Sequence, residues 1–197
     1  GKKGGELRIA VCSQFVLERT ACLVDVSGGV EVRFTVALPA SGRSIEGIWC
    51  ARVLCERALD LALKAVVSRD DDDLARHVAS VIKQRSLRDA LAEKGLVAFV
   101  GDGARLARRA GNDDRPMVDG AVPFDSRKCG GLRTELNGVT GLGLPKGLSL
   151  ICGGGFHGKS TLLQALQVGC FDKVPGDGRE LCVSDPNCVK VRAEDGR

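Results

Sequence analysis

A glycine-rich motif at residues 153–161 constrains this chain more than any other feature of its sequence. It reads Gly-Gly-Gly-Phe-His-Gly-Lys-Ser-Thr and fits the pattern G-x-x-x-x-G-K-[ST] of phosphate-binding loops. The apolar residues 148–152 before it predict a buried strand, and residues 161–168 after it predict a helix that ends at Gly169. A strand, a glycine-rich turn and a helix N-terminus are together typical of a triphosphate site. A glycine-rich turn that precedes Lys-Ser by chance would not need these neighbours.

The motif predicts a binding site for ATP, ADP and Mg²⁺. Lys159 would reach the β- and γ-phosphates and is the candidate catalytic residue, and the Ser160 hydroxyl would ligate the metal. His157 either contacts phosphate or only packs inside the loop, and the sequence leaves both roles open. The predicted nucleotide-binding residues of the loop are Gly154, Gly155, Phe156, His157, Gly158, Lys159, Ser160 and Thr161.

Composition sets broader limits. The 197 residues are 44% hydrophobic, enough for one good core or two small ones. No apolar run approaches the roughly 20 residues of a membrane span, and no signal peptide opens the chain, so we expect a protein that is neither secreted nor membrane-spanning. The chain starts without Met, and an organelle-targeting segment upstream is compatible with it. We therefore expect the mitochondrial matrix or the cytoplasm.

The nine cysteines indicate reduced thiols rather than a disulfide framework or a zinc site. Their number is odd, no C-x-x-C pair occurs, and the chain has two histidines, His77 and His157. A reducing compartment is the expected setting.

A basic cluster is the candidate RNA-binding surface, formed by Arg105, Arg108 and Arg109. The alternative is a solvated basic face that pairs with Asp113 and Asp114. The net charge of +4 is mild, and the chain has no Tyr, one Trp and six Phe. So few aromatic side chains argue against base stacking and for phosphate contacts.

Residues 1–94 predict a small α+β domain. Residues 20–26 and the alternating residues 30–38 predict two strands of a hairpin, followed by a helix of roughly twenty residues. Four aspartates at 70–73 suit the first turn of a helix over 74–84 better than a metal site. Ser86 predicts the cap of a further short helix that ends at Gly95.

Residues 95–197 predict an α/β domain. Strands are expected at 96–100 and 121–124, and a hairpin joins 132–136 to 139–144 around Asn137-Gly138. Residues 181–185 predict a strand that ends in an Asp-Pro turn, because no second carboxylate follows Asp185.

Several motifs of the chain resemble those of one family, the predicted ATPases of the ABC class, which lack a transporter membrane domain. They lie at residues 28–36, 95–100, 113–116 (Asp-Asp-Arg-Pro), 120–124, 141–163, 175–180 (Pro-Gly-Asp-Gly-Arg-Glu) and 192–197. The resemblance covers most of the chain from about residue 18 onward. It implies a P-loop NTPase core of ABC type in residues 95–197, of which this chain holds the first half, behind the small α+β domain.

The resemblance also implies function. ABC heads are dimeric ATPases, and a kinetoplastid mitochondrial RNA-editing factor belongs to the same family, so it implies a homodimeric head that binds RNA. An RNA-binding accessory factor that uses nucleotide as a switch is therefore the alternative function. An aromatic residue lies under adenine upstream of the loop in ABC heads, and Phe124 is the candidate, although a core Phe is an equal interpretation.

Two departures from ordinary ABC heads stand out. Residues 155–157 are Gly-Phe-His, where transporter ATPases have Asn-Gly-x before the last glycine. The chain also shows no Walker B Asp-Glu, signature motif or switch histidine after the loop. We therefore expect the groups that complete hydrolysis to come from residues beyond 197 and from a second subunit.

Overall fold

The computed structural model describes residues 4–68 and 70–193, so residues 194–197 of the motif at 192–197 lie outside the described chain. The chain forms two compact units. Unit 1 comprises Gly1–Cys12 and Glu18–Leu74, and unit 2 comprises Ser13–Leu17 and Ala75–Arg197. Both units combine helices with strands.

Unit 1 contains short antiparallel strand pairs. The predicted hairpin is confirmed: β3 (Cys22–Val24) pairs with β4 (Val30–Val32). The other pairs are β1 (Leu7–Arg8) with β5 (Thr35–Val36), and β6 (Ala40–Ser41) with β7 (Ser44–Ile45). The prediction of one strand over 30–38 is wrong, because its first part pairs with β3 and its second with β1, and the chain leaves the strand conformation between them.

The helix expected after these strands is confirmed and runs over 21 residues. It consists of α1 (Gly47–Arg52), a π-helical turn (Val53–Arg57) and α2 (Ala58–Val67). Val53 and Ala58 are buried, so this helix contributes the apolar face of unit 1.

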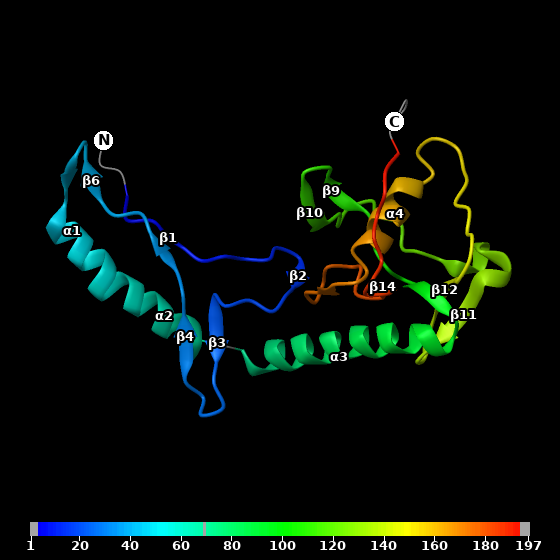
Figure 1. The fold of residues 1–197 in the computed structure, drawn as a ribbon, viewed down its shortest axis with the longest axis horizontal. Coiled ribbons are helices and arrows are strands. Elements are labelled where there is room, and N and C mark those ends of the chain that lie inside the picture. Colours follow the sequence, from blue (N-terminus) through cyan, green and yellow to red (C-terminus); the bar gives the residue numbers. More distant parts are fainter. Residues whose placement is uncertain (1–3, 69, 194–197) are drawn as a thin grey trace. The chain divides into compact units, whose positions relative to one another are not determined.

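A single long helix, α3 (Asp71–Glu93), replaces the two helices predicted over 74–94 (Figure 1). The acidic run does form its first turn, where the Asp70 side chain accepts hydrogen bonds from the amides of Asp72 (2.9 Å) and Asp73 (3.1 Å). Ser86 does not cap a new helix. Its hydroxyl instead accepts a hydrogen bond from the Asn137 side-chain amide at 2.7 Å, and α3 continues past Ser86 to Glu93.

A four-stranded antiparallel sheet forms the centre of unit 2, in the order β11-β12-β8-β14. The strands are β8 (Leu96–Gly101), β11 (Arg133–Leu136), β12 (Val139–Pro145) and β14 (Cys182–Ser184). Three sequence predictions are thereby confirmed: the strand at 96–100, the hairpin around Asn137-Gly138, and the strand before Asp185. The shorter pairs in this unit are β2 (Phe15–Val16) with β13 (Asp172–Lys173), and β9 (Arg108–Ala110) with β10 (Asp113–Pro116).

Each face of this sheet is covered by a helix. Ala98 and Val100 of β8 belong to a core that includes Ala165 and Leu166 of helix α4 (Lys159–Gln167). Phe99 points to the other face and joins Leu87 and Leu91 of α3. Residues 98–100 of β8 therefore alternate between the two cores, as the period of two in a strand requires. The sheet fixes the helix that starts at the phosphate loop.

Two predicted strands are absent from unit 2. Residues 148–152 form no strand, and Leu148 and Leu150 are exposed; the segment belongs to the irregular yellow chain between β12 and α4 in Figure 1. A strand persists only where a neighbour satisfies its backbone groups, and no described strand lies beside this segment. Residues 121–124 are likewise irregular, and Phe124 exchanges backbone hydrogen bonds with Gly103 and Ala104, both at 2.8 Å.

The Lys173 side chain is buried beside the C-terminus of α4. Its ammonium donates hydrogen bonds to the carbonyl oxygens of Val168 and Phe171 and lies 4.8 Å from the centre of the Phe15 ring. Gln84 of α3 pairs with the Lys173 backbone at 2.7 and 2.9 Å. Burial lowers the pKa of Lys173 to about 8.

This pKa predicts how stability changes in alkaline solution. Because the pKa of Lys173 is about 8 in the folded protein and 10.5 as a model value, the folded chain binds fewer protons between these pH values. The contribution of Lys173 to the free energy of unfolding should therefore rise as the pH increases from about 8 to about 10.5. Chemical denaturation across this range, compared with Lys173→Met, measures the contribution. Parallel pH profiles of the two proteins would contradict it.

Candidate nucleotide-binding site

The phosphate loop runs directly into α4, as the sequence predicts. Gly158 is the N-cap residue, with φ +81° in the left-handed region that glycine tolerates best. The first helical hydrogen bond runs from the Leu162 amide to the Gly158 oxygen at 2.9 Å. The amides of residues 159–161 therefore precede the first helical bond. Such a helix N-terminus, with its free donors and positive dipole end, suits an anion.

Two side chains of the loop form hydrogen bonds with the loop's own backbone. The Gly154 amide donates to Nδ1 of His157 at 3.2 Å, and the Lys159 ammonium donates to the Gly154 oxygen. His157 thus packs inside the loop here, and a contact with phosphate stays a prediction. A bound phosphate would compete for the same amide and the same ammonium.

Phe156 has an unusual backbone conformation. Its φ is +59°, which is rare for a bulky residue and costs about 1–3 kcal/mol, and its side chain is fully exposed. No burial of the ring offsets this strain. The path of the loop backbone therefore determines the conformation of Phe156, and the backbone is the part that would meet phosphate.

Ser160 is the predicted metal ligand, and that role stays a prediction. It occupies the second position of α4 and is exposed. Within the described residues its hydroxyl makes no hydrogen bond, so the oxygen is free to bind a cation. Mg²⁺ prefers oxygen ligands and keeps several waters, and a single hydroxyl beside bound phosphates suits it.

Phe124 lies against the core that includes Ala104 and Leu106, and its side chain is half-buried. Packing of this kind is what the core interpretation of Phe124 requires. Its predicted place under adenine stays a prediction.

The three arginines of the predicted basic cluster lie in different environments. Arg108 is 11% exposed and is held by Asp177, through 2.8 Å hydrogen bonds to the carboxylate and to the backbone oxygen. Arg105 and Arg109 are exposed. RNA binding by the three arginines stays a prediction, and the structure places two of them at the surface. The pairing of Arg108 with Asp177 could not be anticipated from the sequence, because 69 positions separate the two residues.

Comparison with known families identifies the chain. A family described as the P-loop domain of the ABC ATPases matches residues 70–197, and one described as the N-terminal part of ATPases of the ABC class matches residues 1–69. The chain belongs to the ATPases of the ABC class. The P-loop match contains the whole loop, α4 and the four-stranded sheet, so this α/β unit is the P-loop domain of the family.

One relative comes from an archaeon. The chain is 33% identical over 130 residues to the uncharacterized protein MJ1628 of Methanocaldococcus jannaschii. The matched region covers 61% of this chain and 29% of that protein, so the chain spans under a third of its relative. Among the helices of residues 4–68 and 70–193, none is long and apolar enough to cross a bilayer.

Proposed function

We propose that residues 153–161 bind the triphosphate of ATP together with Mg²⁺. The observation that carries the proposal is the start of α4, where Gly158 takes the left-handed conformation and three amides precede the first helical bond. Phosphate oxygens would accept hydrogen bonds from these amides. The Lys159 ammonium would leave the Gly154 oxygen for the β- and γ-phosphates, and the Gly154 amide would leave His157.

The loop residues also define what this chain contributes to hydrolysis. Lys159 and the amides neutralise negative charge on the β- and γ-phosphates, which is the electrostatic part of phosphoryl transfer. Mg²⁺ bound by Ser160 would add further charge neutralisation. We propose that the full-length protein hydrolyses ATP as a dimeric head, in which other residues position the attacking water.

A serine replacement tests the metal part of the site. We expect Ser160→Ala to lower the affinity for Mg-ATP by about tenfold, about 1.4 kcal/mol, and to leave the affinity for ATP in EDTA unchanged. The matched control is Ser149→Ala, which removes an exposed hydroxyl before the loop. Isothermal titration calorimetry measures both. Equal losses with and without Mg²⁺ would show that Ser160 does not bind the metal.

A further inference from the structure

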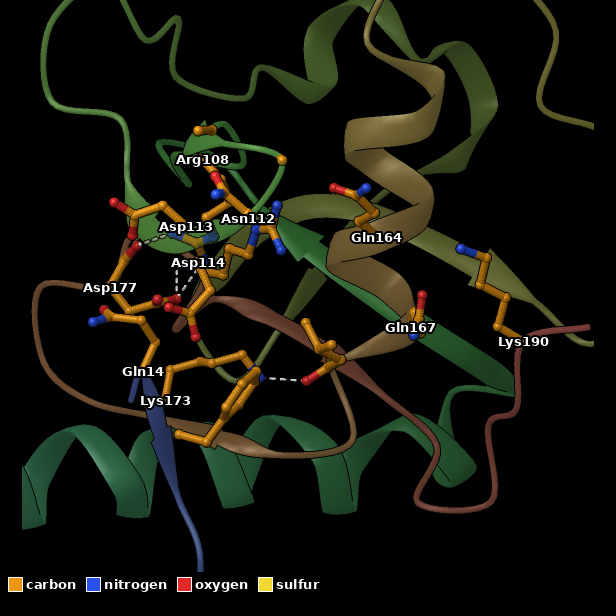
Figure 2. Close-up of a pocket in the computed structure, with 15 residues that line it drawn as sticks. Gln14, Arg108, Asn112, Asp113, Asp114, Gln164, Gln167, Lys173, Asp177 and Lys190 are labelled. Atoms are coloured by element: carbon orange, nitrogen blue, oxygen red, sulfur yellow. Dashed lines mark hydrogen bonds and ion pairs between the residues drawn. The ribbon is translucent and has the colours of Figure 1, made fainter. Parts of the chain in front are cut away.

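A cavity lies in unit 2, away from the phosphate loop. Its volume is about 450 Å³, within the range of small-molecule sites. Figure 2 shows Gln164 and Gln167 of α4 on one side of it and Asn112, from the turn between β9 and β10, on the other. Gln164 and Gln167 lie five and eight residues after Lys159, or about 8 and 12 Å along the helix axis at 1.5 Å per residue. The cavity is therefore distinct from the loop at the N-terminus of α4.

Buried charged groups line the cavity, and positive charge is in excess. The buried Lys173 and Arg179 and the half-buried Arg108 face one buried carboxylate, Asp177, and Arg108 is the residue that pairs with it. Arg179 is 4% exposed, and its Nε and Nη2 donate hydrogen bonds to the backbone oxygen of Leu106. Lys173 uses backbone carbonyls as partners. Among the described residues, Lys173 and Arg179 thus form no ion pair, although Asp177 is the carboxylate near both.

The exposed edge of the cavity does not cancel this charge. Asp113 and Asp114 line it, but Asp113 is paired with Arg115, at 2.6 Å, and Asp114 accepts a hydrogen bond from Ser13 at 2.7 Å. Lys190 adds a further exposed cation. With the two ion pairs set aside, Lys173, Arg179 and Lys190 remain against Asp114, a formal balance of two positive charges.

Burial makes the charged forms of Lys173 and Arg179 costly. It lowers the pKa of Lys173 to about 8 and that of Arg179 to about 10, which means that the charged forms are disfavoured. An anion in the cavity would reverse the effect. Nη1 of Arg179 and Nε of Arg108 make no hydrogen bond within the described residues and remain available as donors. Oδ2 of Asp177 is buried without a partner there and can accept a hydrogen bond from a water or a hydroxyl.

Two sequence motifs with no assigned role meet at this cavity. The motif at 113–116 supplies Asp113 and Asp114, and the motif at 175–180 supplies Asp177 and Arg179. Both motifs therefore lie beside α4, the helix that begins at Lys159.

We propose that this cavity is a second anion site that binds a terminal phosphate group, carried by a nucleotide or by the end of an RNA. A phosphate monoester carries about 1.5 to 2 negative charges at neutral pH, which matches the excess of positive charge. Guanidinium groups suit phosphate oxygens because they donate in a planar fork. The side-chain amides of Asn112, Gln164 and Gln167 can hydrogen-bond the sugar or base attached to the phosphate.

The test uses the 197-residue chain with Lys159→Ala, which removes the main cation of the phosphate loop. Calorimetry should show that AMP binds at least tenfold more tightly than adenosine. Lys190→Gln and Gln164→Glu should each lower the affinity for AMP by about threefold to tenfold. Both residues are exposed, so the fold should tolerate these changes. The matched control, Lys146→Gln, replaces an exposed lysine outside the cavity and should leave AMP binding unchanged.

Two oligoribonucleotides of the same sequence identify the source of the phosphate. Tighter binding of the 5′-phosphorylated RNA than of both AMP and its 5′-hydroxyl counterpart would assign the site to RNA ends. Equal or weaker binding than AMP would assign it to a free nucleotide. The proposal is overturned if AMP binds no better than adenosine, or if Lys190→Gln and Gln164→Glu behave like Lys146→Gln. Since the phosphate loop is disabled throughout, these outcomes do not depend on the ATP site.

Discussion

Replacing Lys159 with alanine should reduce the affinity for Mg-ATP by about 100-fold, equivalent to about 2.7 kcal/mol, and leave the fold intact. The ammonium lies in the exposed loop and bonds to the Gly154 oxygen, so its removal costs no core packing. In the bound state it would make charge-assisted hydrogen bonds to phosphate, worth about 1.5–3 kcal/mol each. Calorimetry with Mg-ATP measures the loss, and circular dichroism checks the fold.

A matched lysine separates the loop from general charge effects. Lys146→Ala removes an exposed cation that follows β12 and precedes the loop. Its affinity for Mg-ATP should equal that of the parent protein. The assignment of Lys159 fails if both variants bind Mg-ATP as the parent does, or if both lose affinity to the same extent.

The second large effect concerns stability. Gly141→Ala should destabilise unit 2 by about 3 kcal/mol or more, because the sheet leaves no room for a side chain there. A Cβ at Gly141 would lie 2.3 Å from the backbone oxygen of Val100 and 2.6 Å from the ring of Phe99. Phe99 is fully buried, so neither neighbour can move away without disturbing the core.

Gly131→Ala is the control for this substitution. A Cβ at Gly131 would meet nothing within 4 Å, and we expect a change within about 0.5 kcal/mol. Urea denaturation of the two variants gives the difference in the free energy of unfolding. Equal stability of Gly141→Ala and Gly131→Ala would show that β8 and β12 are not packed as closely as the structure indicates.

Local signals in the sequence predicted the elements that position the loop. The helix after Lys159, the Asn137-Gly138 hairpin and the strand at 96–100 all follow from short-range patterns, and all are confirmed. Residues 148–152 share the apolar character of a strand, yet no described strand pairs with them. Apolar residues favour a strand, but a partner strand decides whether it forms.

Long-range contacts account for what the sequence did not predict. Ser86 of α3 bonds to Asn137, which is 51 positions away, and Gln84 bonds to Lys173 across 89 positions. The pairing of Arg108 with Asp177 leaves Arg105 and Arg109 as the exposed members of the basic cluster. Arg108 and Asp177 also line the cavity beside α4. None of these contacts has a signature in the local sequence.

Hydrogen–deuterium exchange on the 197-residue chain, with and without Mg-ATP, tests the central claim most directly. If the loop binds the triphosphate, the backbone amides of residues 154–161 should become protected when Mg-ATP is added. These amides include the Gly154 donor that now bonds to His157 and the three that precede the first helical bond of α4. In the Lys159→Ala variant this protection should largely disappear. Binding of Mg-ATP with unchanged exchange across residues 154–161 would contradict the account and place the nucleotide elsewhere.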